Sequence, residues 1–236
     1  MEEEKVIAFI AARGGSKRFK NKNIFLHNNK PLISYPIEAA RKSKIFNHLV
    51  VATDSKKIEK ISLNLGVAIF NRTKKSASDY AHETQALKEY LENLKRQGKE
   101  IPSLICMIYP TAILLTKKDL INSYKIIKDN KNIDVVMGVS KYNYSPYKAL
   151  SYNDRGYLTP IFKNKAQKRS QKTKEMFVSN GTIYWHRTAA FLKEGYSGHY
   201  GNKMKGFLMD FDISIDIDKK SDLKKIFKYY SYNYGK

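Results

Sequence analysis

Hydrophobic and polar positions follow two alternating patterns along the chain. Short and almost wholly apolar runs are typical of buried strands. They occupy residues 5–12 (KVIAFIAA), 48–54 (HLVVATD), 67–72 (VAIFNR), 103–110 (SLICMIYP) and 134–140 (DVVMGVS). Segments with apolar residues at helical spacing separate these runs, over residues 31–44, 55–66, 83–97 and 117–129. This alternation predicts an α/β fold, in which helices cover both faces of a mostly parallel sheet.

Two later regions depart from this rhythm. Turn-forming and basic residues from Tyr142 to about Met176 predict an inserted arm, which with its flanking segment covers about 142–190. The segment MDFDISIDID (209–218) alternates strictly and predicts a strand, and residues 219–230 then predict a closing helix. Because nothing looks like a flexible linker, we expect a single domain over residues 1–236.

The first predicted strand runs into a basic loop, ARGGSKRFKNKNI (12–24). Ligands of open α/β sheets bind beyond the carboxyl ends of the strands, where this loop, Asp54 and the pair Tyr109–Pro110 should all lie. Two adjacent glycines allow successive N–H groups to face one concavity, and five basic side chains follow between Arg13 and Lys22. The loop predicts a triphosphate site, with a solvated basic turn as the alternative.

Acidic residues are concentrated in the late alternating segment. Asp210, Asp212, Ser214, Asp216 and Asp218 stand at intervals of two and would share one face of a strand. Carboxylates placed so close together repel one another unless a cation compensates, and ligands that are all oxygen suit Mg²⁺. The alternative is the exposed polar face of an edge strand.

The net charge of +22, from 44 basic and 22 acidic residues, is typical of nucleic-acid-binding proteins. Yet the lysines are spread from Lys5 to Lys236, and Lys, Asn, Ile and Tyr are abundant together, as AT-rich codons would produce. We therefore interpret the charge mainly as genome composition and expect no specific nucleic-acid partner. A basic nucleic-acid-binding α/β module stays as the alternative function.

Other features narrow the function further. No apolar run approaches the roughly 20 residues that span a bilayer, and the chain starts with acidic residues, so we expect a cytoplasmic protein with no membrane partner. Cys106 lies in an apolar run and is expected to be a buried hydrophobic residue. The histidines show no ligand spacing and are expected to be structural or on the surface; they are His27, His48, His82, His186 and His199.

Several motifs, in this order, resemble those of the acylneuraminate cytidylyltransferase family, which activates sialic-type sugars as CMP conjugates. They are ARGGSKRFKNKNI, VVATDS, NRTKKSASD, IYPTA, SPYKAL, KRSQ, NGTIYW and SIDID, and they run through nearly the whole chain. The resemblance implies a Rossmann-like nucleotidyltransferase fold and a reaction that joins CTP to a nine-carbon 2-keto acid sugar, with loss of pyrophosphate. It also implies a homodimer in which the arm reaches over the partner's site.

The resemblance assigns roles to individual residues. Arg13 and Lys17 would be catalytic. The CTP site would comprise Ala12, Arg13, Gly14, Ser16, Lys17, Lys22, Asn23, Arg72, Ala77, Ser78, Asp79 and Tyr109. The sugar site would comprise Lys148, Arg169, Gln171, Asn180 and Tyr184. Asp216 and Asp218 would hold Mg²⁺.

The identity of the sugar stays open among neuraminic, legionaminic and pseudaminic acids. The motifs ARGGSKR and IYPTA are more similar to the branch that activates pseudaminic acid, whereas NGTIYW is closer to the sialic and legionaminic branches. Tyr109 and Leu115 replace a glutamine and an arginine that are common in sialic acid synthetases. The related transferase for the eight-carbon sugar Kdo is the alternative enzyme.

Overall fold

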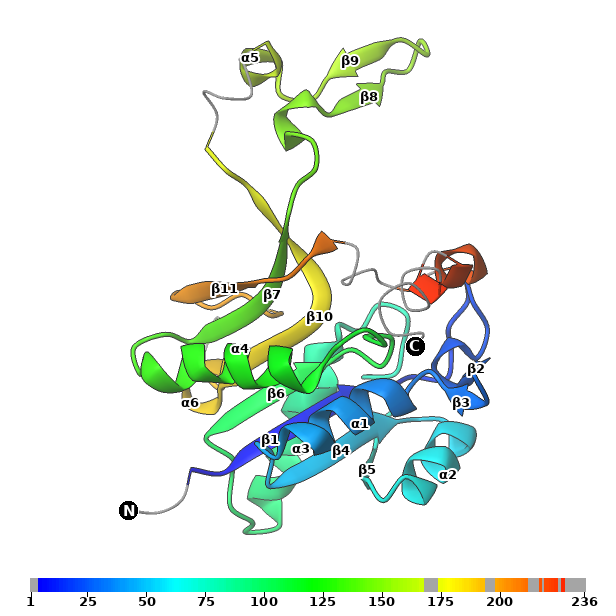
Figure 1. Ribbon diagram of the computed structural model, residues 1–236, viewed down its shortest axis with the longest axis vertical. Helices are drawn as coiled ribbons and strands as arrows, with labels where there is room; N and C mark the ends of the chain where they lie inside the picture. The colour runs from blue at the N-terminus through cyan, green and yellow to red at the C-terminus, as the bar shows by residue number, and fades with distance from the viewer. Residues whose placement is uncertain are drawn as a thin grey trace.

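The computed structural model describes residues 4–167, 174–193, 198–211, 217, 219–224 and 226–227. Its main body is a seven-stranded sheet in the order β11-β7-β10-β6-β1-β4-β5, from which a long arm projects (Figure 1). The strands are β1 (Val6–Ala11), β4 (His48–Thr53), β5 (Ala68–Asn71), β6 (Leu104–Ile108), β7 (Val135–Lys141), β10 (Phe177–Arg187) and β11 (Met204–Leu208). The five apolar runs of the sequence all became strands of this sheet.

Most neighbouring strands are parallel, as predicted. β1 pairs in parallel with β4 and β6, β4 pairs with β5, and β11 pairs with β7. Only β10, within the described sheet, runs antiparallel to its neighbours β6 and β7. The carboxyl ends of β1, β4, β5 and β6 therefore meet at one edge.

Helices cover both faces because each has one apolar side. α1 (Ser34–Ser43), α2 (Lys56–Asn64) and α4 (Lys117–Asp129) bury residues such as Ile37, Ile58 and Leu120 against one face. α3 (Glu83–Arg96) packs Leu87 and Leu91 against the other face, together with Phe191 of α6 (Thr188–Phe191). Cys106 is fully buried in β6, as expected.

The arm leaves the sheet after β7 and returns at β10 (Figure 1). It contains η2 (Pro146–Lys148), the hairpin of β8 (Leu150–Tyr152) and β9 (Leu158–Pro160), and α5 (Lys163–Ala166). Since β10 pairs with both β6 and β7, residues 177–187 belong to the sheet. The arm therefore ends near Met176, and the expected outer limit of about 190 is too late.

The end of the chain packs back onto the basic loop. Ile217 and Leu223 are buried in a third apolar cluster with Phe19 of the loop and Leu32, which precedes α1. A short hairpin of β2 (Leu26–His27) and β3 (Lys30–Pro31) follows η1 (Lys22–Ile24) beside this cluster. Residues 220–224 and 226–227 are helical, as predicted for the closing segment.

The strand predicted over residues 209–218 is wrong for its described first residues. β11 ends at Leu208, and Met209 still donates its N–H to the Val139 carbonyl at 2.8 Å. Asp210 and Phe211 lie outside the strand. Residues 212–216 and 218 lie outside the described residues.

Among the described residues, each helix is too short or too polar to cross a lipid bilayer.

Candidate active site

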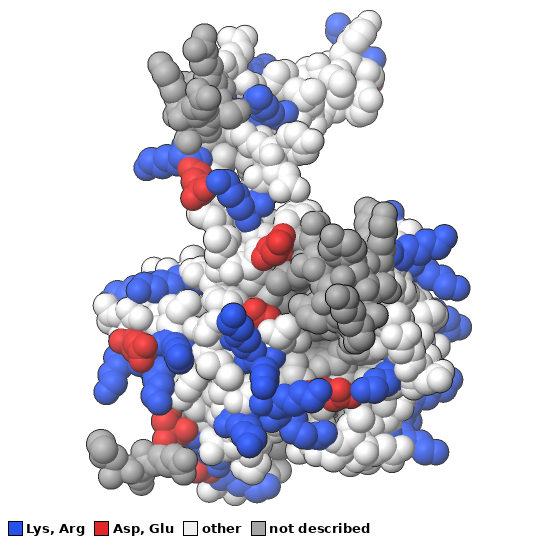
Figure 2. All heavy atoms as spheres, viewed as in Figure 1, with Lys and Arg blue, Asp and Glu red and all other residues white. Residues whose placement is uncertain are grey.

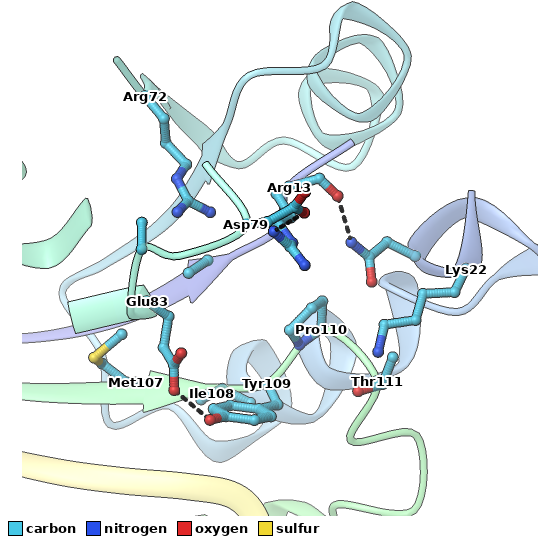
Figure 3. A pocket seen from close by; sticks show the side chains of 13 residues that line it. Arg13, Lys22, Arg72, Asp79, Glu83, Met107, Ile108, Tyr109, Pro110 and Thr111 are labelled. Carbon is cyan, nitrogen blue, oxygen red and sulfur yellow. Dashed lines mark hydrogen bonds and ion pairs between the residues drawn. The ribbon is translucent and has the colours of Figure 1, made fainter. Parts of the chain in front are cut away.

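A hollow lies at the sheet edge where β1, β4, β5 and β6 end. A cavity of about 190 Å³ is lined by residues that include Arg13, Arg72, Glu83 and Tyr109. A second cavity, of about 420 Å³, adjoins it over the basic loop and shares Arg13, Lys22, Asn23 and Asp79 with the first. Figure 3 shows Arg13, Lys22 and Arg72 around a common space above Tyr109 and Pro110.

The start of the basic loop is fixed against the next strand. Gly14 donates its N–H to Asp54 Oδ1 at 2.8 Å, directly after β4. A Cβ atom at Gly14 would lie only 2.8 Å from Cβ of Ser55, so a larger residue would push the two chain segments apart. Ala12, just before it, is fully buried and donates its N–H to the Ala52 carbonyl at 2.9 Å. The glycine therefore allows a close approach that sets the direction of the loop.

Asp79 connects the basic loop to the segment after β5. Its carboxylate lies 2.9 Å from Arg13 Nη1 and 2.5 Å from Lys17 Nζ. The hydrogen bond from Lys17 lowers the pKa of the Asp79 carboxyl, so this group stays ionised. Arg13 also donates to the Ser78 carbonyl at 3.3 Å, and Ala77 donates its N–H to the Thr73 carbonyl at 3.0 Å. The 77–79 segment is thus held against the two cations expected to be catalytic.

Two buried polar groups have spare hydrogen-bonding capacity. Asn23 is 4% exposed and donates to the Arg13 carbonyl at 3.1 Å, but its Oδ1 has no partner among the described residues. Arg72 is 8% exposed and donates to the Ser76 carbonyl, whereas its Nε–H has no partner in the described part of the chain. Burial lowers the pKa of Arg72, and the unpaired donor still needs an acceptor. Both residues line the smaller cavity, so a polar ligand there would satisfy them.

Lys22 connects the basic loop to the far end of the chain. Its Nζ donates to the main-chain carbonyl of Ile217 at 2.8 Å, although the two residues are 195 positions apart. Ile217 is fully buried, and Asp216 and Asp218 flank it in the sequence. These two aspartates, expected to bind the metal, lie outside the described residues.

The floor of the cavity carries a carboxylate that the sequence did not reveal. Glu83, at the start of α3, accepts a hydrogen bond from the Tyr109 hydroxyl (Figure 3). It accepts a second from His199 Nε2 at 2.8 Å. Burial alone would raise the pKa of Glu83, but the hydrogen bonds from His199 and Tyr109 lower it to about 2. The site therefore holds a fixed negative charge opposite its basic loop.

The remaining predicted site residues are only partly brought together. Ser16 lines the larger cavity. Tyr184 is buried in β10 beside the site, where its hydroxyl lies 2.7 Å from Ser179 Oγ. Asn180 marks a bulge of β10 and donates to Ser140 Oγ at 3.2 Å.

Lys148 lies in the arm and lines neither cavity of its own chain. Arg169 and Gln171 lie outside the described residues.

Sequence reasoning missed Glu83 and the way in which three of the histidines gather near it. His82, His186 and His199 gather beside Glu83, although the sequence places His199 117 positions after His82. The local signal was the pair His82–Glu83 at the start of a predicted helix, directly after the SASD segment. Nothing in the spacing could have joined that pair to His199.

Known proteins are similar to this chain in sequence and in architecture. A family model described as Cytidylyltransferase matches residues 7–234. A pseudaminic acid cytidylyltransferase of Campylobacter jejuni (strain 81-176) is 31% identical over 221 residues, which cover 93% of this chain and 94% of that protein. A Helicobacter pylori protein, whose name joins a pseudaminic acid cytidylyltransferase to a UDP-sugar hydrolase, is 32% identical over 188 residues. That match covers 79% of this chain but only 35% of the H. pylori protein.

A solved CMP:2-keto-3-deoxy-manno-octonic acid synthetase, in complex with CTP, shares the fold. It superposes with a TM-score of 0.70 at 17% identity and covers 97% of this chain and 99% of that one. With the family model spanning nearly all of the sequence, the Rossmann-like nucleotidyltransferase fold is confirmed, and the chain belongs to the cytidylyltransferase family.

Proposed function

We propose that this protein transfers the cytidylyl group of CTP to a nonulosonic acid, giving a CMP-sugar and pyrophosphate. The observation that carries the proposal is the cavity at the carboxyl edge of the sheet. There Arg13 and Lys22 lie beside the buried and partly unpaired polar groups of Asn23 and Arg72. In a cytidylyltransferase, these groups suit an anionic nucleotide that carries both phosphates and a polar base.

The reaction depends mainly on positioning the two substrates and on stabilising the negative charge that develops. The anomeric hydroxyl oxygen of the sugar attacks the α-phosphorus of CTP, and the bond from that phosphorus to the bridging oxygen of pyrophosphate breaks. The proton of the hydroxyl group passes to solvent. Arg13 and Lys17 oppose the negative charge that grows on the phosphate oxygens, which is how such transfers are chiefly accelerated. Both cations contact Asp79, so a bound triphosphate would replace the Asp79 carboxylate as their partner.

The magnesium ion is part of the proposal, with Asp216 and Asp218 as its ligands. The supporting observation is the bond from Lys22 to the Ile217 carbonyl, because it brings the main chain between these aspartates to the basic loop. Two carboxylates supply the oxygen ligands that Mg²⁺ prefers. When bound, Mg²⁺ neutralises charge on the departing pyrophosphate. By its bond to Ile217, Lys22 would keep the segment that carries the two aspartates next to the basic loop.

We also propose a homodimer in which the arm completes the partner's sugar site. The arm exposes large apolar side chains, including Leu150, Tyr152, Leu158 and Ile161, each more than half exposed. Such clustered apolar exposure is typical of an interface. Lys148 lines neither cavity of its own chain, which fits a role in the partner's sugar site together with Arg169 and Gln171.

The sugar side of each site would also include Asn180 and Tyr184 of the chain that binds CTP. Because CTP is a cytoplasmic metabolite, we place the reaction in the cytoplasm.

The basic surface does not require a nucleic-acid partner. Figure 2 shows Lys and Arg side chains on the arm, across the middle of the body and at both of its sides, with acidic side chains among them. A spread of this kind is what genome composition would produce. We therefore expect weak binding to random duplex DNA that disappears as salt rises.

The test is pyrophosphate release by the full-length protein with CTP and Mg²⁺. Neuraminic, legionaminic, pseudaminic and Kdo acids are supplied in turn, with UTP in place of CTP as the control. The proposal predicts release with at least one nonulosonic acid. A preference for Kdo would favour the related octulosonic enzyme, and no release with any acid would contradict the proposal.

A further inference from the structure

Two histidines converge on Glu83, which lines the smaller cavity. His82 and Glu83 stand at the start of α3, and His199 comes from the segment before β11. One ligand atom from each lies within 4.8 Å of the others. We propose that His82, Glu83 and His199 form a binding site for a zinc ion, separate from the magnesium site of the proposed reaction. This proposal does not depend on which reaction the protein catalyses.

The ligand atoms of His82, Glu83 and His199 are close enough to surround one small ion once their side chains rotate. Glu83 Oε1 lies 2.8 Å from His199 Nε2 and 3.8 Å from His82 Nε2. In a tetrahedral zinc site with bonds of about 2.0–2.2 Å, neighbouring ligand atoms are about 3.3 Å apart. The two measured separations lie on either side of that value. The ligand atoms of His82 and His199 lie within 4.8 Å of each other, so movements of up to about 1.5 Å would bring all three ligand atoms around the ion.

His199 is already held in a fixed orientation. Its ring stacks on Tyr184 with centroids 3.6 Å apart and planes 9° apart, and it is only 4% exposed. Its Nδ1 lies 3.1 Å from Nε2 of the fully buried His186. A histidine that binds a metal usually donates its other ring N–H to a neighbouring acceptor. When the ion binds, it would displace the proton that His199 Nε2 donates to Glu83. Nδ1–H would then donate to His186, and the lone pair of Nε2 would point toward Glu83 and His82.

Hydrogen bonds also orient the other two proposed ligands, Glu83 and His82. The Tyr109 hydroxyl donates to Glu83 and fixes the position of its carboxylate. His82 Nδ1 accepts the main-chain N–H of Thr84 at 3.3 Å and also lies 2.8 Å from Thr84 Oγ1. When Nε2 binds a metal, Nδ1 would carry the ring proton and donate it to Thr84 Oγ1 instead. The His82 side chain is 46% exposed, so the ion has an entry path and its fourth position stays open to water.

The ligand set indicates zinc rather than magnesium. Imidazole nitrogens suit Zn²⁺, whereas Mg²⁺ prefers oxygen ligands. Two histidines and one glutamate with an open fourth position are the arrangement of many zinc sites that bind water or substrate. Here the ion would tie the segment that carries His199 to the start of α3, beneath the cavity lined by Glu83 and Tyr109.

The test measures metal binding directly. Full-length protein is stripped with a chelator, dialysed against Zn²⁺ in a buffer free of phosphate and nucleotide, and assayed for bound zinc. We expect wild type to bind a zinc ion that His82→Ala loses, whereas His48→Ala, which removes an exposed histidine at the start of β4, keeps it. Circular dichroism confirms that each variant is folded.

Further variants keep the test decisive. Glu83→Gln, which is nearly isosteric, should also lose the ion, and this variant replaces His82→Ala if the latter fails to fold. The double variant Asp216→Asn/Asp218→Asn should keep it, which separates this ion from the proposed magnesium site. Bound Co²⁺ should give the visible absorption of tetrahedral coordination. The proposal is overturned if wild type binds no zinc, or if folded His82→Ala and Glu83→Gln bind as much as wild type.

Discussion

Lys22 Nζ donates to the main-chain carbonyl of Ile217 at 2.8 Å and so joins the basic loop to the last part of the chain. Phe19 of the same loop packs in the apolar cluster that contains Ile217 and Leu223. The loop and the described residues Ile217 and Leu223 therefore form one structural unit, although nearly two hundred positions separate them in the sequence.

Replacing Lys22 should damage both the loop and the terminal segment. Lys22→Met keeps most of the aliphatic side chain but removes a charged hydrogen bond, a change that typically costs about 1.5–3 kcal/mol. We expect kcat/KM for CTP to fall about 10- to 100-fold and the melting temperature to drop. Lys20→Met is the matched control, because Lys20 is an exposed lysine of the same loop that lines neither cavity. Equal kinetics for the two variants would rule out this role of Lys22.

Arg13 should matter mainly in the transition state. Losing a contact of this kind typically lowers turnover by about 10²-fold or more, and we expect that loss in Arg13→Ala. The measurement is steady-state pyrophosphate release at saturating CTP, with circular dichroism to verify the fold. Arg96→Ala, at the exposed end of α3, is the control and should behave as wild type. Near-normal turnover in Arg13→Ala would remove it from the catalytic residues.

Asp79 should compete with the triphosphate for Arg13 and Lys17. Its carboxylate lies 2.9 Å and 2.5 Å from the two cations, and exposed ion pairs of this kind are individually weak. Asp79→Asn should therefore tighten binding of inorganic triphosphate by a few-fold, as measured by isothermal titration calorimetry at low salt. The gain should shrink as salt is added. Weaker binding in this variant would mean that Asp79 helps to form the site rather than competing for it.

Much of the fold could be predicted from the sequence, because each buried strand or amphipathic helix shows its buried side in its own stretch of residues. The basic loop could be placed at the carboxyl edge for the same reason, since β1 ends at Ala11. Contacts between distant segments left no such signal, and so the cluster of His82, Glu83 and His199 was missed. Alternation misled at Met209–Phe211, because β11 ends at Leu208 although its parallel register with β7 could have continued as far as Lys141, and an alternating pattern does not fix where strand pairing stops.

The proposed dimer makes a specific prediction about mixed variants. If Lys148 acts in the partner's site, Lys148→Ala and Arg13→Ala should each be nearly inactive alone. After subunit exchange, each mixed dimer would contain one intact site, so an equal mixture should recover about a quarter of wild-type activity. Light scattering should report about twice the 27.3 kDa chain mass. A fully active monomer, or no recovery from dimers shown to exchange, would contradict the shared site.

Substitutions in the acidic segment should separate the aspartates that bind the metal from the one that does not. Asp216→Asn and Asp218→Asn should each lower activity strongly and raise the Mg²⁺ concentration that gives half-maximal rate. Asp210→Asn should have little effect, because Asp210 lies just beyond β11 and before the segment attached to Lys22. Mg²⁺ titrations of the three variants provide the comparison. If Asp210→Asn were the damaging change, the assignment of the metal ligands would be wrong.

The central claim is that the cavity beside Arg13 and Lys22 transfers a cytidylyl group to an acidic sugar. The most direct measurement supplies CTP labelled at the α-phosphorus together with a nonulosonic acid and Mg²⁺, and follows the label and the pyrophosphate together. The account predicts that the label enters a CMP-sugar, with one unlabelled pyrophosphate released for each product formed. Label that appears only as free CMP at a rate independent of the sugar, or that stays in CTP with every acid supplied, would contradict it.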